Sequence, residues 1–279
     1  LVGGVKLSGD VAADYKLLME GKFGAALPTL LATIKDRLKT GLAKKDKILG
    51  CDTNAKAVGC DVEIRLLHQV IRSLEPANVF AQIILGWHAM AAEDMLVGLN
   101  LVAPEDGHVA LRDYTQHMQM IDYLYKPLGE QNVTLHAGEL TLGLVRPKQL
   151  RFHMWQALEL GHAKRPGHAI DVIYEHDSEK LIKKLVDDDI MIEINLTSND
   201  VILGVSGSDH PLVLYRDMEV PYAISTDDEG VSRIDLTNEY MRLHKDFNAP
   251  YFELRHSSRN SLTYSFLPGT SLWKSADCV

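Results

Sequence analysis

The sequence predicts a parallel α/β fold of the barrel type, with about six βα units behind an N-terminal helical segment. Two observations indicate this fold. From about residue 61 onward, apolar strand-like runs alternate with amphipathic helical stretches, which is typical of parallel α/β proteins. The later strand-like runs each end in His, Glu, Asp or Asn, and in a parallel barrel these ends face one mouth, where barrel enzymes place their chemistry.

The first part of the chain has a different pattern. Residues 11–49 are expected to be wholly helical, with Pro28 opening a run and Gly41 and Gly50 interrupting it. No strand is evident before residue 60. We therefore expect residues 1–60 to form a mainly helical segment.

Six strands are expected after that segment, at 61–71, 95–102, 132–138, 161–170, 190–197 and 221–228. The clearest helix between them is 109–126. Its apolar residues recur at helical spacing and are expected to pack in the core: Val109, Tyr114, Met118, Ile121 and Tyr125. Since no repeat, low-complexity tract or Pro/Gly-rich linker divides the chain, we expect 1–279 to be a single domain whose site lies within 61–279.

Charge and composition exclude several partners. The net charge of -9 argues against nucleic acid and anionic membranes, because both are bound through excess Lys and Arg. The basic run 35–47 is expected to be a solvated helix and turn. No stretch has 18 consecutive apolar residues, so no membrane span is expected, and "LVGGVKLSGD" lacks the features of a signal peptide. A cytoplasmic location is favoured, with export as the alternative because the chain does not begin with Met.

Three cysteines, Cys51, Cys60 and Cys278, are too few for a disulfide framework in a chain of 279 residues. A Cys51–Cys60 bridge that closes a loop is possible. Free thiols are the favoured alternative, and no His is placed to suggest that any of them is a nucleophile.

Polar residues at the strand ends indicate the chemistry. They are His136 and Glu139 after the third strand, His168 after the fourth, Ser198 and Asn199 after the fifth, and Asp227 and Asp228 after the sixth. His and Asp are ligands that suit Zn²⁺, whose bound water becomes acidic enough to attack near neutral pH. A nearby Glu and a second His are natural proton carriers. This set predicts metal-assisted hydrolysis.

The motifs "TLHAGE", "RPGHA", "TSND" and "STDD" occur in this order with α/β spacing and together resemble the adenosine deaminase family. The resemblance runs from about residue 60 to about 273. It implies a TIM-type (β/α)8 barrel, a zinc-dependent aminohydrolase, one Zn²⁺ per chain and a small-molecule purine nucleoside as partner. It implies nothing about the oligomeric state.

The resemblance also implies roles for individual residues. His136 and Asp227 match zinc ligands, and Glu139 matches the acid that protonates N1 of the purine. His168 matches the base that orients and deprotonates the attacking water. Asp228 matches the acceptor that holds the purine N7. The expected reaction is hydrolysis of adenosine, or of a related aminopurine nucleoside, to inosine and ammonia.

Some of these polar residues have structural alternatives. Asp228 could cap the following helix. Ser198 and Asn199 are expected to brace their loop, and His153 and His162 to lie on the surface or behind the site. The histidines outside the motifs are expected to be structural: His88, His117, His210, His244 and His256.

The sequence departs from the family pattern in three places. Family members carry a His-x-His pair on the first strand, whereas "GGVKLSG" has Gly4 and Lys6 at the corresponding positions. We expect the true His-x-His segment to lie outside this sequence, because two ligands rarely hold a catalytic zinc. Ala103, a candidate substrate contact, replaces a Gly, and Pro166 stiffens the turn before His168. These departures leave two alternatives: a catalytically incomplete purine-binding barrel, or a deaminase of another aminated heterocycle.

Overall fold

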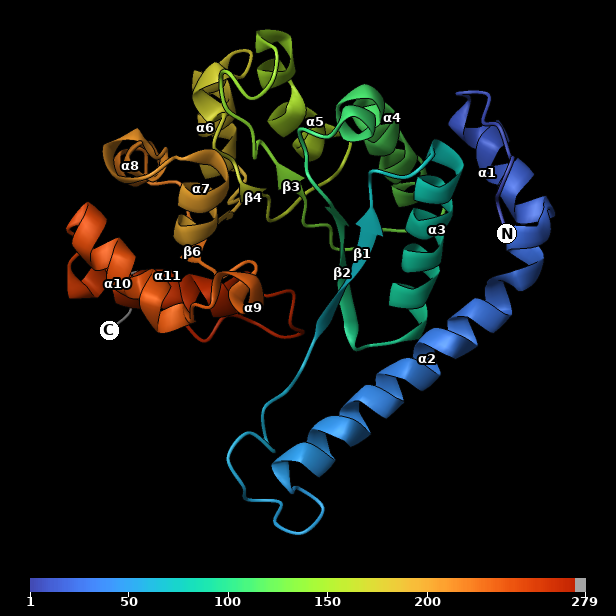
Figure 1. Ribbon diagram of the computed structural model, residues 1–279, viewed down its shortest axis with the longest axis horizontal. Helices are drawn as coiled ribbons and strands as arrows, with labels where there is room; N and C mark the ends of the chain where they lie inside the picture. The colour runs from blue at the N-terminus through green and yellow to red at the C-terminus, as the bar shows by residue number, and fades with distance from the viewer. Residues whose placement is uncertain (274–279) are drawn as a thin grey trace.

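The computed structural model describes residues 1–273, and its parallel strands follow one another in chain order (Figure 1). They are β1 (Leu66–Ile71), β2 (Leu96–Val102), β3 (His136–Ala137), β4 (Gly167–His168), β5 (Ile192–Ile194) and β6 (Tyr222–Ile224). Strand β1 pairs with β2, and β3 to β6 pair in order. A parallel bridge between Leu99 and Val133 joins β2 to the residues before β3. Each of the six expected segments therefore contains a strand, and the predicted parallel order is confirmed.

The register of these strands aligns their carboxyl ends. His136 lies opposite Gly167 and Ala137 opposite His168, while Ile194 lies opposite Ile224. Side chains that follow β3, β4 and β6 therefore emerge at one edge of the sheet. Among the described residues, β1 and β6 do not pair with each other, so the six strands form an open section of a barrel.

Helices surround the outer side of the strands (Figure 1). The α-helices are α3 (Pro76–Ala92), α4 (His108–Tyr125), α5 (His153–Glu159), α6 (Ser178–Asp187), α7 (Leu196–Leu203), α8 (Leu212–Asp217), α9 (Glu229–Ser232), α10 (Leu236–Phe247) and α11 (Tyr251–Thr263). Short 3-10 helices are η1 (Pro147–Arg151), η2 (Val172–Tyr174) and η3 (Gly207–Asp209). Helix α4 confirms the expected helix at 109–126, and Tyr114, Met118 and Ile121 are buried in the core as predicted.

The N-terminal segment is helical, as expected, but its internal boundaries differ from the prediction. Helices α1 (Val11–Glu20) and α2 (Lys22–Leu49) meet at a bend of 71°. Pro28 lies inside α2 and α2 continues through Gly41, because a 28-residue helix tolerates one missing backbone hydrogen bond and one flexible residue. Gly50 ends α2 in the left-handed conformation. In the described part of the chain no single helix is long and apolar enough to cross a membrane. The bent pair α1 and α2 reaches that length and apolar content only when the two helices are taken together.

The expectation of free thiols at Cys51 and Cys60 is wrong, because these two cysteines form a disulfide. After Gly50 the chain turns back on itself through backbone hydrogen bonds from Asn54 to Gly50 and from Cys60 to Ala57. These turns bring the two Cα atoms to 5.6 Å, within the distance that a disulfide spans. Cys278 lies outside the described residues.

Candidate active site

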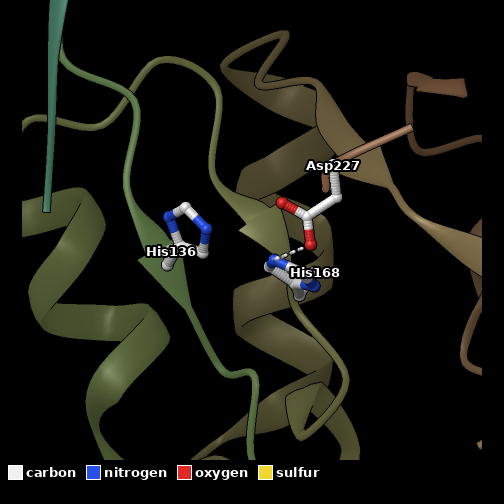
Figure 2. Close-up of side chains that lie close together, drawn as sticks. All are labelled: His136, His168 and Asp227. Carbon is white, nitrogen blue, oxygen red and sulfur yellow. Dashed lines mark ion pairs between the residues drawn. The ribbon is translucent and has the colours of Figure 1, made fainter. Parts of the chain in front are cut away.

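Three side chains from the aligned strand ends point toward one another (Figure 2). His136 comes from β3, His168 from β4, and Asp227 from the segment after β6. One potential ligand atom from each lies within 4.8 Å of the others, and His168 Nε2 is 3.9 Å from Asp227 Oδ2. The structure therefore brings together three of the residues that the motifs predicted, in a group that could hold a metal ion.

The environment of His136 suits a metal ligand. Asn100 Oδ1 accepts a hydrogen bond from the His136 backbone N–H at 3.2 Å and lies 3.1 Å from His136 Nδ1. Because the backbone N–H can only donate, the Asn100 atom must be the oxygen, and His136 Nδ1 must carry the ring proton. The lone pair is then on Nε2, as in metal sites whose other ring nitrogen is held by an oxygen. With the Asp227 carboxylate beside it, this donor set fits zinc.

His168 has an unusual backbone conformation. Its φ is 70° and that of Ala169 is 49°, a left-handed region that costs non-glycine residues about 1–3 kcal/mol each. Backbone hydrogen bonds from Ala169 to Ala137 and from Ile170 to Gly138 hold this segment against the end of β3. Asp227 is also left-handed, with φ 52°. Such strained residues cluster at functional sites, and here two of the three clustered residues, His168 and Asp227, have a left-handed backbone.

Glu139 lies beside His168 and is mostly buried. Its Oε1 is 3.6 Å from His168 Nδ1, and the exposed fraction of its side chain is 11%. Burial, together with the negative charges of Glu105 and Asp227, raises the pKa of Glu139 to about 8. Glu139 therefore retains its proton near neutral pH and can act as a general acid.

A buried pair of side chains, Glu105 and His153, holds the turn that carries Glu139. Glu105 accepts hydrogen bonds from the backbone N–H of Gly138 at 3.1 Å and of Glu139 at 2.8 Å, and its Oε1 lies 2.5 Å from His153 Nδ1. Burial alone would raise the pKa of Glu105, but the hydrogen bond and charge of His153 and the charge of Arg72 outweigh it and lower that pKa to about 2. Two neighbouring glutamates thus have opposite protonation states.

Arg72 and Glu105 are site-supporting residues that the motifs did not reveal. Arg72 is buried and donates hydrogen bonds to the carbonyls of Ala103, at 2.8 Å, and His136, at 3.0 Å. The available signal was a charged residue shortly after an apolar strand: Arg72 directly follows β1, and Glu105 lies three residues after β2. His153 lies behind the site, one of the two positions expected for it, whereas His162 lies partly exposed, with its ring stacked on Tyr125.

Replacing Glu105 with Ala is expected to destabilise the fold by about 3–5 kcal/mol, because His153 and two backbone N–H groups lose a buried partner. The free energy of unfolding from urea denaturation measures this effect. Glu105→Gln keeps one acceptor oxygen and is expected to cost less. Equal stability of Glu105→Ala and the native chain would mean that this pair does not hold the turn.

The two predicted substrate contacts lie in different environments. Asp228 is exposed and occupies the N-cap position of α9, but its side chain makes no capping hydrogen bond, so its carboxylate is free to bind another group. Ala103 follows β2 with φ 81°, and its carbonyl is bound by Arg72. The positions of Asp228 and Ala103 do not show whether either residue contacts substrate, so both contacts stay predictions.

Comparisons with known proteins agree with this arrangement. The sequence model described as "Adenosine deaminase" matches residues 31–277. An adenosine deaminase of Clostridium perfringens (strain ATCC 13124) is 29% identical over 171 residues, which is 61% of this chain and 48% of that protein. The chain thus matches about half the length of this curated relative.

Solved structures share the fold. The N6-methyl-AMP deaminase from Arabidopsis thaliana superposes with a TM-score of 0.58 at 22% identity, covering 77% of this chain and 60% of that one. A zinc-bound amidohydrolase from Burkhoderia ambifaria gives a TM-score of 0.57 at 15% identity, covering 75% and 54%. The fold is therefore the TIM-type barrel fold of the adenosine deaminases, as the sequence predicted.

The family match covers most of the chain and includes all four motifs. The motif residues His136, Glu139, His168 and Asp227 lie together at the strand ends. This chain belongs to the adenosine deaminase family.

Proposed function

We propose that this chain carries the active site of a zinc-dependent aminohydrolase that converts adenosine, or a closely related aminopurine nucleoside, to inosine and ammonia. One observation carries the proposal. A carboxyl group that stays protonated near neutral pH, Glu139, lies 3.6 Å from His168, which in turn lies between it and the proposed zinc ligand Asp227. This arrangement supplies an acid beside a metal position, as hydrolytic deamination requires.

The chemistry assigns a task to each group. Glu139 donates its proton to the ring nitrogen next to the carbon that bears the amino group, which makes that carbon electrophilic. Water adds at that carbon and passes one of its protons to the amino group, which leaves as ammonia. The other proton returns to Glu139, so a C–O bond replaces a C–N bond and Glu139 is again protonated. His168 orients the attacking water, and a bound zinc ion would supply a Lewis acid that makes this water more acidic.

His136 and Asp227 would hold one Zn²⁺ per chain. Their donor atoms, an imidazole nitrogen and a carboxylate oxygen, are those that catalytic zinc sites use, and Asn100 leaves His136 Nε2 available. A catalytic zinc usually has three protein ligands, of which these residues supply two.

The charges around the site favour a nucleoside over a nucleotide. The carboxylates that act on His136 and Glu139 are Glu105, Asp106, Asp227 and Asp228, against the single cation Arg72. A phosphate group would be repelled by this negative field, whereas a neutral nucleoside would not. The matched proteins differ on this point, since one is named for adenosine and another for N6-methyl-AMP.

Ammonia release from a substrate panel tests the proposal. The zinc-loaded protein that carries this chain is given adenosine, adenine, AMP and N6-methyl-AMP at equal concentration. We expect adenosine to react fastest, and adenine to lose most of the rate because the binding energy of the ribose is lost. Faster ammonia release from AMP or N6-methyl-AMP would mean that the substrate is a nucleotide. Purine binding without ammonia release would favour a non-catalytic binding protein, the alternative that Gly4 and Lys6 raise.

The disulfide bears on the compartment. Structural disulfides persist in oxidising environments and are rare in the cytosol. The Cys51–Cys60 bridge therefore favours export over the cytoplasmic location that the sequence alone suggested.

A further inference from the structure

His210 was expected to be structural, yet it begins a chain of hydrogen bonds that ends at the candidate active site. Its ring is buried, and the backbone N–H of Leu212 donates to its Nδ1 at 3.0 Å. A backbone N–H can only donate, so Nδ1 must present a lone pair. Burial lowers the pKa of His210 to about 4, so the ring is neutral at pH 7 and its one proton is on Nε2.

The Asn199 side-chain amide lies between His210 and His168 and hydrogen-bonds to both rings. His210 Nε2 lies 3.1 Å from Asn199 Oδ1, which accepts its proton, and this contact fixes the orientation of the side-chain amide. The amide nitrogen, Asn199 Nδ2, then lies 2.9 Å from His168 Nδ1 and donates to it. Asn199 is fully buried at the start of α7, so water does not compete for either bond.

His168 must therefore accept at Nδ1. An imidazole ring with a lone pair on one nitrogen is neutral and carries its single proton on the other nitrogen. With Nδ1 accepting, that proton is on Nε2, the atom that lies 3.9 Å from Asp227 Oδ2. Asn195, whose Nδ2 lies 3.5 Å from Nε2, has a side-chain oxygen with no partner among the described residues and can offer that oxygen to the proton by turning its amide.

We propose that His210 and Asn199 are positioning residues that hold the proton of His168 on Nε2, so that His168 faces the site as a hydrogen-bond donor and does not ligate the metal. His136 and His168 then have opposite tautomers. An amide oxygen, from Asn100, leaves the Nε2 lone pair of His136 free, whereas an amide nitrogen, from Asn199, keeps a proton on the Nε2 of His168.

The tautomer changes the task of His168. A protonated Nε2 cannot ligate a cation, so the group of three potential ligands contributes two, His136 and Asp227. An N–H at this position donates to the oxygen of the attacking water or of the product, and it does not accept a proton from that water. This consequence rests on the proposed function, whereas the tautomer itself does not.

Two-bond ¹H–¹⁵N NMR of the ¹⁵N-histidine-labelled full chain, without and with zinc, tests the proposal directly. A nitrogen that bears a proton and one that bears a lone pair have widely separated ¹⁵N shifts. We expect His168 to show a protonated Nε2 in both samples, and zinc to shift Nε2 of His136 alone. A protonated Nδ1 on His168, or a zinc-induced change at its Nε2, would overturn the proposal.

An isosteric variant gives a second readout. In Asn199→Asp both side-chain oxygens accept, so the proton of His168 is expected to move to Nδ1. The ¹⁵N shifts of its two ring nitrogens should then exchange, with Nδ1 in the protonated range. Ser198→Ala is the matched control, because Ser198 lies on the same turn and its buried hydroxyl has no hydrogen-bond partner in the described part of the chain. Its His168 spectrum should stay native. An unchanged tautomer in Asn199→Asp would also contradict the proposal.

The two proposals can fail separately. If no purine is deaminated but His168 carries its proton on Nε2, the tautomer inference stands and the proposed function fails. If adenosine is deaminated but His168 is protonated on Nδ1, the function stands and the inference fails.

Discussion

Replacing Glu139 with Gln is expected to lower the turnover number for adenosine by about 10²- to 10⁴-fold, the usual contribution of a general acid. Gln has the same shape as Glu but carries no acidic proton for the ring nitrogen. The zinc content should not change, because the ligands His136 and Asp227 are untouched. Steady-state ammonia release gives the turnover number, and elemental analysis of the same sample gives the zinc content.

The pH dependence of the deamination rate tests whether the proton of Glu139 is the one used in the reaction. Glu139 is active in its protonated form, so the rate should fall as pH rises through its pKa, which burial raises to about 8 in the metal-free chain. A bound divalent cation would lower that pKa, so the falling limb should lie at or below about pH 8. The residual activity of Glu139→Gln should lack this limb.

Glu159→Gln is the control for the same chemical change at an exposed position, and it should behave as the native protein. Native turnover by Glu139→Gln would show that Glu139 is not the acid.

Removing either proposed zinc ligand is expected to abolish stoichiometric zinc binding and, with it, deamination. Replacing groups that merely orient metal ligands weakens metal affinity by about 10- to 100-fold, and deleting a ligand should cost more than that. His136→Ala and Asp227→Ala should therefore lose zinc during dialysis. Native mass spectrometry gives the zinc bound per chain.

Two neighbouring variants serve as controls for this loss. Asp228→Ala should retain zinc and raise the KM for adenosine, since Asp228 is proposed to bind substrate. His168→Ala should also retain zinc, because we propose that its Nε2 carries a proton. If zinc stays with Asp227→Ala, or leaves with His168→Ala, the assigned ligand set is wrong.

The strands were the most predictable part of the fold. A parallel strand is covered on both faces, so it is apolar along most of its length, and helices of different periodicity separate it from the next strand. The strand lengths were less predictable: β3 and β4 are two residues long, whereas runs of seven and ten residues were expected. Isolated bridges at Val133 and Ala163 show where the chain leaves regular pairing.

The site was predictable to the extent that its residues belong to motifs. His136 and Glu139 stand three residues apart, His168 ends β4 and Asp227 follows β6 by three residues, so local sequence marks them all. Arg72, Asn100 and Glu105 lie outside the four motifs. Their contacts are 31 or more residues away in the chain, and no local pattern indicates such a contact.

The sequence by itself determined the alternation of strands and helices, and hence the edge at which His136, His168 and Asp227 meet, because burial and periodicity act over a few residues. Only the tertiary structure decided which of Glu105 and Glu139 is protonated, which ring nitrogen of each active-site histidine carries the proton, and the pairing of Cys51 with Cys60. Glu105 is ionised and Glu139 protonated because burial and partner charges differ between them. The two active-site histidines differ because Asn100 offers an oxygen and Asn199 a nitrogen, and both choices depend on atoms that only folding brings together.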